Sequence, residues 1–162
     1  MNTRRLFRTP RTRQRGVATL EFALITGFGL LPLLFLTYTG VMLMAVQQTL
    51  SVASAEGARA SLRYASMGER QAAACFAARR SMQWLLAYTK QAPNCSAGGS
   101  GPIAVSVQST CADMASAQCI HVQVSYDYRS HPFLPGTGRM YGWVMQRPMQ
   151  STAVAQLDMG SN

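Results

Sequence analysis

The feature that most constrains this chain is a long stretch without any charged side chain, from Phe22 to Ala55, which covers 34 positions. A helix needs about 20 predominantly apolar residues to cross the hydrocarbon core of a bilayer. The most apolar part, Phe22 to Val46, is long enough for that. The chain has 162 residues, so it has room for one membrane helix and one small folded domain.

The basic residues are concentrated ahead of this stretch. The net charge is +9, but six of the 15 basic residues precede Gly16, so residues 17–162 keep nine basic and six acidic residues, or +3. A basic block beside a hydrophobic helix is retained in the cytoplasm, which predicts a cytoplasmic N-terminus and an exported C-terminal part. The alternative is a nucleic-acid-binding arm, but the confinement of the charge to the leader argues against it. The six arginines are Arg4, Arg5, Arg8, Arg11, Arg13 and Arg15.

A glycine and a lone carboxylate mark the start of the apolar stretch. The order Arg15-Gly16-Val17-Ala18-Thr19-Leu20-Glu21-Phe22 places Glu21 five residues after Gly16. A carboxylate in a membrane-length apolar segment costs roughly 2.5–3.5 kcal/mol on insertion scales, so it should be neutralised by a partner. Cleavage after Gly16 would create a new amine, on Val17, close to Glu21. We therefore expect the Gly16–Val17 bond to be a processing site.

This segment resembles the processing site of type IV prepilins, whose leader is cut after a glycine and whose fifth mature residue is a glutamate. The variant found here is most similar to the TadE-type pseudopilins of the tight-adherence (Tad, or Flp) pilus system. The later element Ala55-Glu56-Gly57-Ala58-Arg59 is similar to the Glu-Gly-Ala-Arg element that follows the membrane helix in that family. The two motifs span about residues 13–64, and the rest of the chain matches only in layout.

The resemblance implies a structural role in pilus assembly. A membrane aspartyl prepilin peptidase would cut between Gly16 and Val17, and Glu21 would then accept a charge pair from the amine of a neighbouring subunit. The implied partners are this peptidase, other pilins or pseudopilins, the inner-membrane assembly machinery and the lipid bilayer, with no nucleic acid. The implied location is the bacterial inner membrane, crossed once, with a periplasmic C-terminal domain that can become part of an extracellular pilus.

The expected organisation is α+β: a leader (1–16), a transmembrane helix (17–46), an extracytoplasmic extension of that helix (47–66) and a small exported domain (67–162). The helix should run from Val17 to about Ser66, with a kink or a weak point at Pro32. In the extension, small residues recur along Ala53, Gly57 and Ser61, and Glu56 and Arg59 can interact across one turn. Such a stripe permits close helix packing, either on a partner subunit or on the protein's own domain.

The exported domain is predicted to be a helix packed on a small antiparallel sheet. The spacing of apolar residues predicts a second helix over 68–90, with one face made of Cys75, Ala78, Met82, Leu85 and Leu86. Alternation predicts one strand around 103–107 and a clearer one over 120–128. A last strand or strand pair is expected at about 140–144 and 149–157. The aromatic residues Tyr126, Tyr128, Tyr141 and Trp143 are expected to pack on the sheet rather than to form a binding face.

Four cysteines, all on the expected exported side, predict two disulfides. The favoured pairs are Cys111–Cys119, which would close a short excursion between paired strands, and Cys75–Cys95, although four cysteines allow three pairings. A zinc site would favour close Cys-x-x-Cys pairs, and the gaps here are 20, 16 and 8.

No pattern in the sequence indicates an enzyme, a cofactor or a metal. His121 falls in the polar register of a strand, and His131 precedes a proline in a loop. Neither has an acidic or cysteine partner at a metal-binding spacing, and Gly98-Gly99-Ser100-Gly101 lacks the lysine of a phosphate loop. The expected chemistry is done to the protein and not by it.

The sequence leaves two alternatives to a processed prepilin. A conventional signal peptide could be cut after Ala53-Ser54-Ala55, but the apolar run of about 25 residues exceeds the 7–15 typical of a signal peptide. The chain could also be an uncleaved single-pass membrane protein whose exported domain binds a ligand or partner. In that case Gly16 and Glu21 would be incidental.

Overall fold

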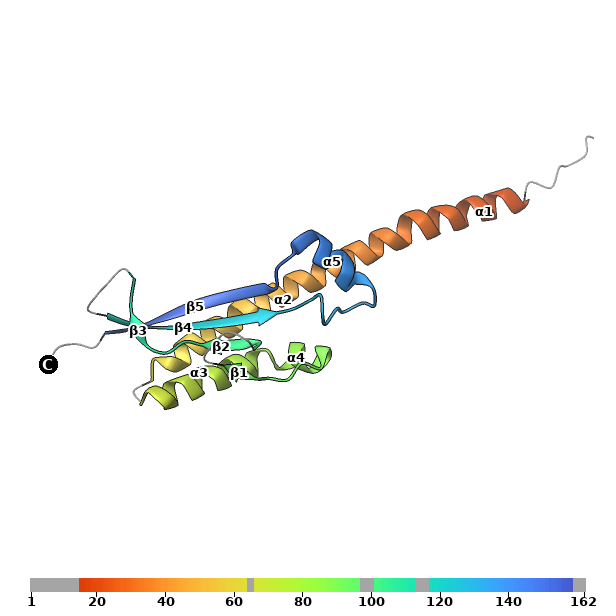
Figure 1. Cartoon of the computed structure of the whole chain (residues 1–162). Coiled ribbons are helices and arrows are strands. Elements are labelled where there is room, and N and C mark those ends of the chain that lie inside the picture. Colours follow the sequence, from red (N-terminus) through yellow and green to blue (C-terminus); the bar gives the residue numbers. More distant parts are fainter. Residues whose placement is uncertain (1–14, 64–65, 97–100, 113–116, 159–162) are drawn as a thin grey trace, which may run out of the picture. The chain divides into compact units, whose positions relative to one another are not determined.

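The computed structural model describes residues 15–63, 66–96, 101–112 and 117–158, and it has the expected α+β architecture (Figure 1). The chain divides into two compact units, 1–42 and 43–162. The helical elements are α1 (Arg15–Ile25), the π-helical segment η1 (Thr26–Leu30), α2 (Leu31–Ser61), α3 (Met67–Ser81), α4 (Gln83–Thr89) and α5 (Thr137–Met145). The strands are β1 (Cys95–Ser96), β2 (Ile103–Val105), β3 (Ser109–Thr110), β4 (Ala117–Tyr126) and β5 (Met149–Asp158).

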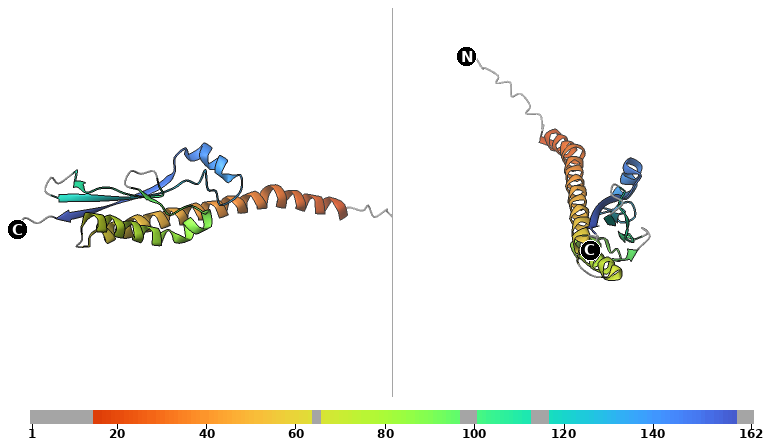
Figure 2. Two further views of the ribbon diagram at one scale, coloured as in Figure 1. Left: turned by 60° about the horizontal axis from the view of Figure 1, so that its bottom comes forward. Right: turned by 90° about the vertical axis from the view of Figure 1, so that its left-hand side faces the viewer.

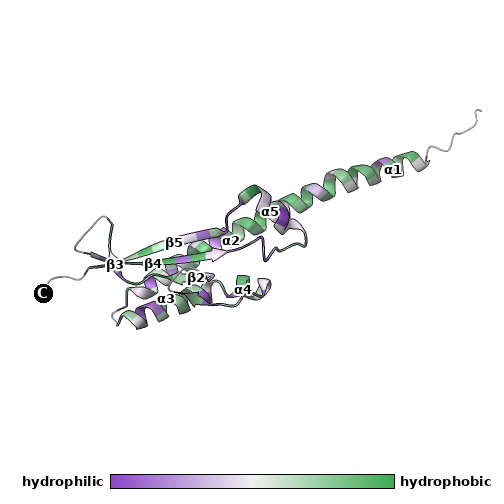
Figure 3. Ribbon diagram, viewed as in Figure 1, coloured by the Kyte–Doolittle hydropathy of each residue, from purple (hydrophilic) through white to green (hydrophobic). Residues whose placement is uncertain are grey.

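The described part of the first unit, residues 15–42, is helical and apolar, as Figure 3 shows for α1 and the start of α2. Its side chains are largely exposed: Phe28 is 82% and Leu36 is 72% accessible. The helical stretch Gly16–Ser61 is long and apolar enough to cross a membrane. Such exposure is unfavourable in water and suits a lipid environment.

The expected irregularity at Pro32 takes the form of the π-helical segment η1 immediately before it. Proline has no N–H to donate, and its ring crowds the carbonyl four residues earlier, here that of Phe28. The wider turn of η1 relieves this crowding, and the N–H of Leu31 donates to the carbonyl of Thr26, five residues back. The helix therefore continues past Pro32 without ending there.

The second unit, which we call the body, is built on a sheet with β4 at its centre. β5 pairs antiparallel with β4 along ten residues, from Ala117↔Asp158 to Tyr126↔Met149. β2 and β3 pair antiparallel with other parts of β4, so they share its second edge. The short β1 joins β2 in parallel.

Helices cover one face of this sheet (Figure 2). Alternate residues of β4 are buried there, namely Ile120, Val122, Val124 and Tyr126. The covering helices are α3 and the part of α2 that belongs to the body; α2 supplies Val46, Leu50 and Ala53, all at most 1% exposed. His121 lies on the opposite face, in the polar register predicted for it. On the same face, Gln123 Nε2 donates a hydrogen bond of 2.9 Å to Gln150 Oε1.

Two sequence-based expectations for helices need correction. The first helix ends at Ser61 and not near Ser66, because Ser66 is the N-cap of α3. Its hydroxyl and backbone N–H both donate to Glu69 Oε2, at 2.7 and 2.9 Å, and these bonds lower the pKa of the Glu69 carboxyl. The predicted helix over 68–90 is two helices, which meet at Met82. The predicted apolar face is nevertheless confirmed for Ala78, Met82, Leu85 and Leu86, which are all buried.

The expected strand at 140–144 is wrong, because these residues belong to the helix α5. Gly136 precedes it with a φ of 89°, a conformation that costs glycine little, and the helix begins at Thr137. Aromatic and branched residues in Met140-Tyr141-Gly142-Trp143-Val144 favour a strand by composition. Here, however, the residues at 138, 141 and 142 share one helical face that packs on the body, and this tertiary contact decides the structure.

Candidate functional site

The expected processing site lies in the first turn of α1. Gly16 is the second residue of that helix, and a side chain built on it would meet no atom within 4 Å. Val17 is 68% exposed. Most of the basic leader, residues 1–14, lies outside the described residues.

Glu21 is exposed on α1 among apolar neighbours. Leu20, Phe22 and Leu24 are 64, 71 and 49% exposed, so the surface around the carboxylate is hydrophobic. In the part of the chain that the structure describes, no cationic side chain forms an ion pair with it; the ion pair found there joins Glu56 and Arg59. A carboxylate on a lipid-facing surface is strongly disfavoured unless it is paired or protonated.

The Glu56-Gly57-Ala58-Arg59 element lies in the body, near the end of α2. Arg59 Nη1 donates to Glu56 Oε1 at 3.0 Å, as the spacing predicted, on the exposed side of the helix. Gly57 lies on the opposite side. A Cβ there would come within 2.8 Å of Val122 Cγ1, 3.2 Å of the Ala74 carbonyl and 3.4 Å of Ala78 Cβ. Glycine is thus required where α2 crosses α3 and β4.

The whole small-residue stripe packs on the protein's own body. Ala53, Ser54 and Ser61 are at most 2% exposed, and Gly57 is also buried. Ser54 Oγ donates to the carbonyl of Ser51 and shares a 3.0 Å hydrogen bond with Ser151 Oγ of β5. Of the two roles left open by the sequence, packing within the subunit is the one that the structure displays for this stripe.

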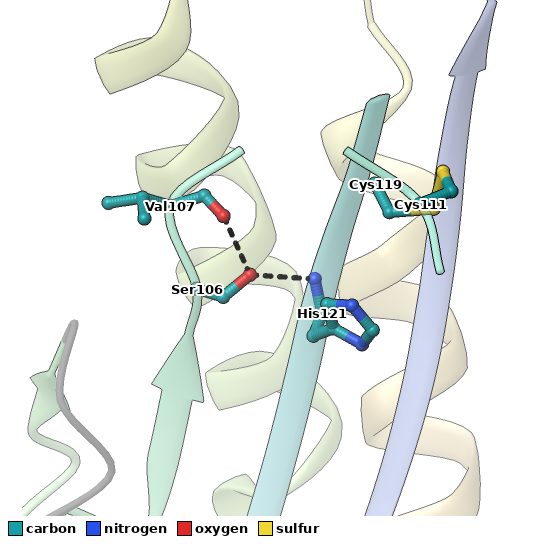
Figure 4. Close-up of a disulfide and its surroundings, with 5 residues drawn as sticks. All are labelled: Ser106, Val107, Cys111, Cys119 and His121. Carbon is teal, nitrogen blue, oxygen red and sulfur yellow. Dashed lines mark hydrogen bonds between the residues drawn. A yellow bond between two sulfur atoms is a disulfide. The ribbon is translucent and has the colours of Figure 1, made fainter. Parts of the chain in front are cut away.

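All four cysteines form disulfides, in the pairing that the sequence favoured. Cys75 of α3 is bonded to Cys95 of β1, with a Cα–Cα distance of 6.1 Å, and Cys111 to Cys119 of β4, with 5.1 Å. Figure 4 shows the second bond beside His121, whose backbone N–H donates to Ser106 Oγ at 2.9 Å. Ser106 Oγ in turn donates to the carbonyl of Val107. No cysteine thiol is left to serve as a zinc ligand.

Aromatic side chains join the end of the sheet to the loop before α5. Tyr126 and Tyr128 are buried, and both lie against Phe133, with ring centroids 5.8 and 5.4 Å apart. The Tyr126 hydroxyl donates to the His131 carbonyl, and burial raises the pKa of this phenol above its ordinary value. Tyr141 of α5 packs on Tyr128 at 4.8 Å. The expected packing role thus holds for three tyrosines but not for Trp143, which is 84% exposed.

Clusters of metal ligands and grooves are two further kinds of place where a ligand could bind. Among them, no three His, Cys, Asp or Glu side chains gather in a way that could hold a metal ion. A groove of about 790 Å³ along α3 and α4 is lined by Arg79, Arg80 and Lys90, without a carboxylate, histidine or cysteine. Such a lining can attract an anion but supplies no general base.

Two features of the body were not predicted from the sequence. Ser66-Met67-Gly68-Glu69 has the Ser-x-x-Glu spacing of a capping box, which marks the start of a helix. The exposed face of α5 could have been found from Met140, Trp143 and Val144, which follow the three- and four-residue spacing of one helical face.

Comparisons of this chain with models of protein families, with curated proteins and with solved structures gave no match. Any function therefore has to be argued from the residues and the geometry described above.

Proposed function

We propose that this chain is a minor pseudopilin that takes part in assembling or anchoring a Tad-type pilus after a prepilin peptidase removes its leader. The observation that carries the proposal is Glu21, the single carboxylate of the first unit, exposed on an apolar helix without a cationic partner among the described residues. Its place five residues after Gly16, behind a basic leader, is the arrangement that prepilin processing requires.

The proposed mechanism uses the amine that cleavage would create. After removal of residues 1–16, Val17 would carry a positive charge at the end of the apolar helix. Glu21 of one subunit would pair with this amine of its neighbour, because each charge is disfavoured in lipid unless neutralised. The pair would set the register between subunits as they leave the bilayer. The apolar side chains around Glu21 would supply the rest of that contact.

The proposed location is the bacterial inner membrane, with the leader in the cytoplasm and the body in the periplasm. The positive-inside rule supports this orientation, because residues 1–16 carry six arginines. The two disulfides lie in the body and are typical of an oxidising compartment, which the periplasm is.

The deciding experiment is the N-terminal sequence and intact mass of the membrane-purified protein, with and without the prepilin peptidase. We expect a start at Val17 that depends on the peptidase. A start at Met1 under both conditions would contradict the proposal and leave an uncleaved single-pass protein. A start at Glu56 would instead reveal a signal peptide. The variant Gly16→Leu should insert normally and remain uncut, whereas Gly27→Leu, in the same apolar helix, should be processed.

A second experiment separates assembly from processing. Glu21→Ala should be cut normally but fail to support pilus production, because the amine of the neighbouring subunit loses its partner. Glu56→Ala is the matched control: it also removes one exposed carboxylate, but one that pairs with Arg59 within the body. Wild-type pilus production by Glu21→Ala would remove this residue from the mechanism.

A further inference from the structure

The helix α5 has two distinct faces. Gly138, Tyr141 and Gly142 face the body, whereas Met140, Trp143 and Val144 are 71, 84 and 67% exposed. These three side chains are spaced as neighbours on one face of a helix. A tryptophan, a methionine and a valine exposed together on one helical face are the kind of apolar patch that marks a contact surface.

The body holds this outer face in a fixed orientation. A Cβ on Gly138 would lie 2.7 Å from the carbonyl of Arg129, so α5 packs there as closely as glycine allows, and the Arg129 side chain lies over Gly142. The Tyr128 hydroxyl is 2.9 Å from Thr137 Oγ1 at the start of the helix. The helix therefore cannot rotate to hide Trp143 without breaking these contacts.

The position of α5 follows from the register inside the body. Gly57 of α2 lies against Val122, and Ser54 bonds to Ser151, which pairs with Val124. Moving backwards along α2 thus leads towards the end of the sheet where β4 stops and β5 starts. α5 is inserted in the chain between those two strands, at that end (Figure 1). It therefore lies at the end of the body at which the body's own part of α2 begins.

The charges around α5 are positive. Arg129, Arg139 and Arg147 are exposed on and beside the helix, and its sequence, Thr137–Met145, contains no acid. The nearby Asp127 is engaged locally: its carboxylate accepts from the Arg129 N–H at 3.0 Å and from Ser130 Oγ at 2.6 Å. Tryptophan with arginine is the combination found where a protein meets the headgroups of a membrane.

We propose that the outer face of α5 inserts into the headgroup region of the bilayer crossed by the apolar helix, with Arg139 and Arg147 directed to anionic phospholipids. The body would then be anchored at two places, through its covalent link to the membrane helix and through α5. This contact goes beyond the pseudopilin assignment, since it requires the membrane helix but not removal of the leader.

Fluorescence of the full-length protein in lipid nanodiscs tests the contact. The chain has two tryptophans, so Trp84→Phe leaves Trp143 as the sole reporter. In discs that contain lipid brominated near the headgroup, we expect Trp143 emission to fall by roughly half, as for an indole at interfacial depth. Lipid brominated near the chain ends should quench less. Emission that is unaffected by bromine but quenched by aqueous acrylamide would overturn the proposal.

Two further arms separate contact with lipid from contact with a second copy of the chain. Trp143→Phe, which keeps Trp84, should be quenched less by the brominated lipid than Trp84→Phe, which keeps Trp143. Discs loaded with a single protein copy should give the same quenching, whereas Trp143 shielded from both bromine and acrylamide only at higher loading would indicate a second copy and contradict the lipid contact. Arg139→Gln/Arg147→Gln in the Trp84→Phe background should remove the increase in quenching that phosphatidylglycerol produces over phosphatidylcholine.

Discussion

The two halves of the long helical segment belong to one continuous run of helix but have opposite environments. Residues 16–42 and 43–61 are both rich in small and apolar side chains, yet Phe28 and Leu36 are mostly exposed while Val46 and Leu50 are fully buried. The glycines show the same contrast. A Cβ on Gly27, Gly29 or Gly40 would meet nothing within 4 Å, whereas one on Gly57 would meet three atoms.

The difference shows that hydropathy and side-chain volume together separate the half that packs on the body from the half whose side chains are exposed, since residues 43–61 also contain Gln47, Gln48, Glu56 and Arg59. Hydroxyl groups are satisfied in the same way in both halves: Thr39 Oγ1 donates to the Phe35 carbonyl at 2.7 Å, and Ser61 Oγ donates to the Ala58 carbonyl at 2.7 Å. Bulky side chains dominate the first half, and the buried face after Leu50 is made of alanine, serine and glycine. Close approach to β4 and α3 requires that change.

The largest expected effect comes from placing the same bulky residue in each half. Gly57→Leu should destabilise the body by on the order of 3 kcal/mol, because Val122 and the Ala74 backbone leave no room for it. Gly40→Leu should leave stability nearly unchanged, since its surroundings are open. Denaturant unfolding in detergent, followed by near-ultraviolet circular dichroism of the buried tyrosines, measures both. Equal stability of the two variants would show that the contrast does not govern folding.

Both disulfides lie in the body, so their removal should destabilise the body and leave the helix over residues 16–42 unaffected. Loss of the Cys75–Cys95 bond, which spans 20 residues, should cost about 3 kcal/mol, and loss of the Cys111–Cys119 bond, which spans 8, about 2.5 kcal/mol. The paired variants Cys75→Ser/Cys95→Ser and Cys111→Ser/Cys119→Ser avoid unpaired thiols. Their unfolding midpoints should fall while the helical far-ultraviolet signal of the apolar segment persists. A coincident loss of that signal would mean that the two units unfold together.

A hydroxyl in each half gives a smaller and sharper test. Ser54 Oγ donates within α2 and therefore accepts from Ser151 Oγ, a tertiary bond in a buried site. Ser54→Ala should cost about 1 kcal/mol, because Ser151 loses its partner. Thr37→Ala removes only a bond to the Leu34 carbonyl in its own helix and should cost less. Unfolding midpoints of the two variants in the same detergent compare them, and a larger loss for Thr37→Ala would contradict the assignment.

The sequence predicted best what depends on composition and local period. The charge-free run identified the apolar helix, alternation identified β4, and the spacing of Ala78, Met82 and Leu85 identified a buried face even though the helix breaks at Met82. The helix at 137–145 was missed because its aromatic and branched residues favour a strand by composition, whereas contacts with Arg129 and Tyr128 stabilise the helix. The partner of the small-residue stripe was likewise undecidable, since Gly57 would permit close packing on any surface. The pairing of Glu21 remains a prediction, because no ion pair of Glu21 is found among the described residues.

The smallest expected effect is a dependence on pH that arises in the body. Burial acts to raise the pKa of Asp127, but hydrogen bonds from the Ser130 hydroxyl and from the N–H groups of Arg129 and Ser130 outweigh it, so the pKa lies below its ordinary 3.8. A lowered pKa means that this stabilisation is complete above about pH 4 and is lost as the pH falls through the folded-state value.

Because the site is largely open to solvent, its contribution should be below about 1 kcal/mol. Unfolding midpoints of the wild type and of Asp127→Asn, measured from pH 7 down to pH 3, check it. The midpoints should converge as the acid range is entered, although Glu69, whose pKa is also lowered, keeps some acid sensitivity in the variant. A constant difference between the two proteins across the range would show that the Asp127 charge does not hold the loop that leads to α5. The orientation of Trp143 would then have to depend on the packing of Tyr141 and the two glycines alone.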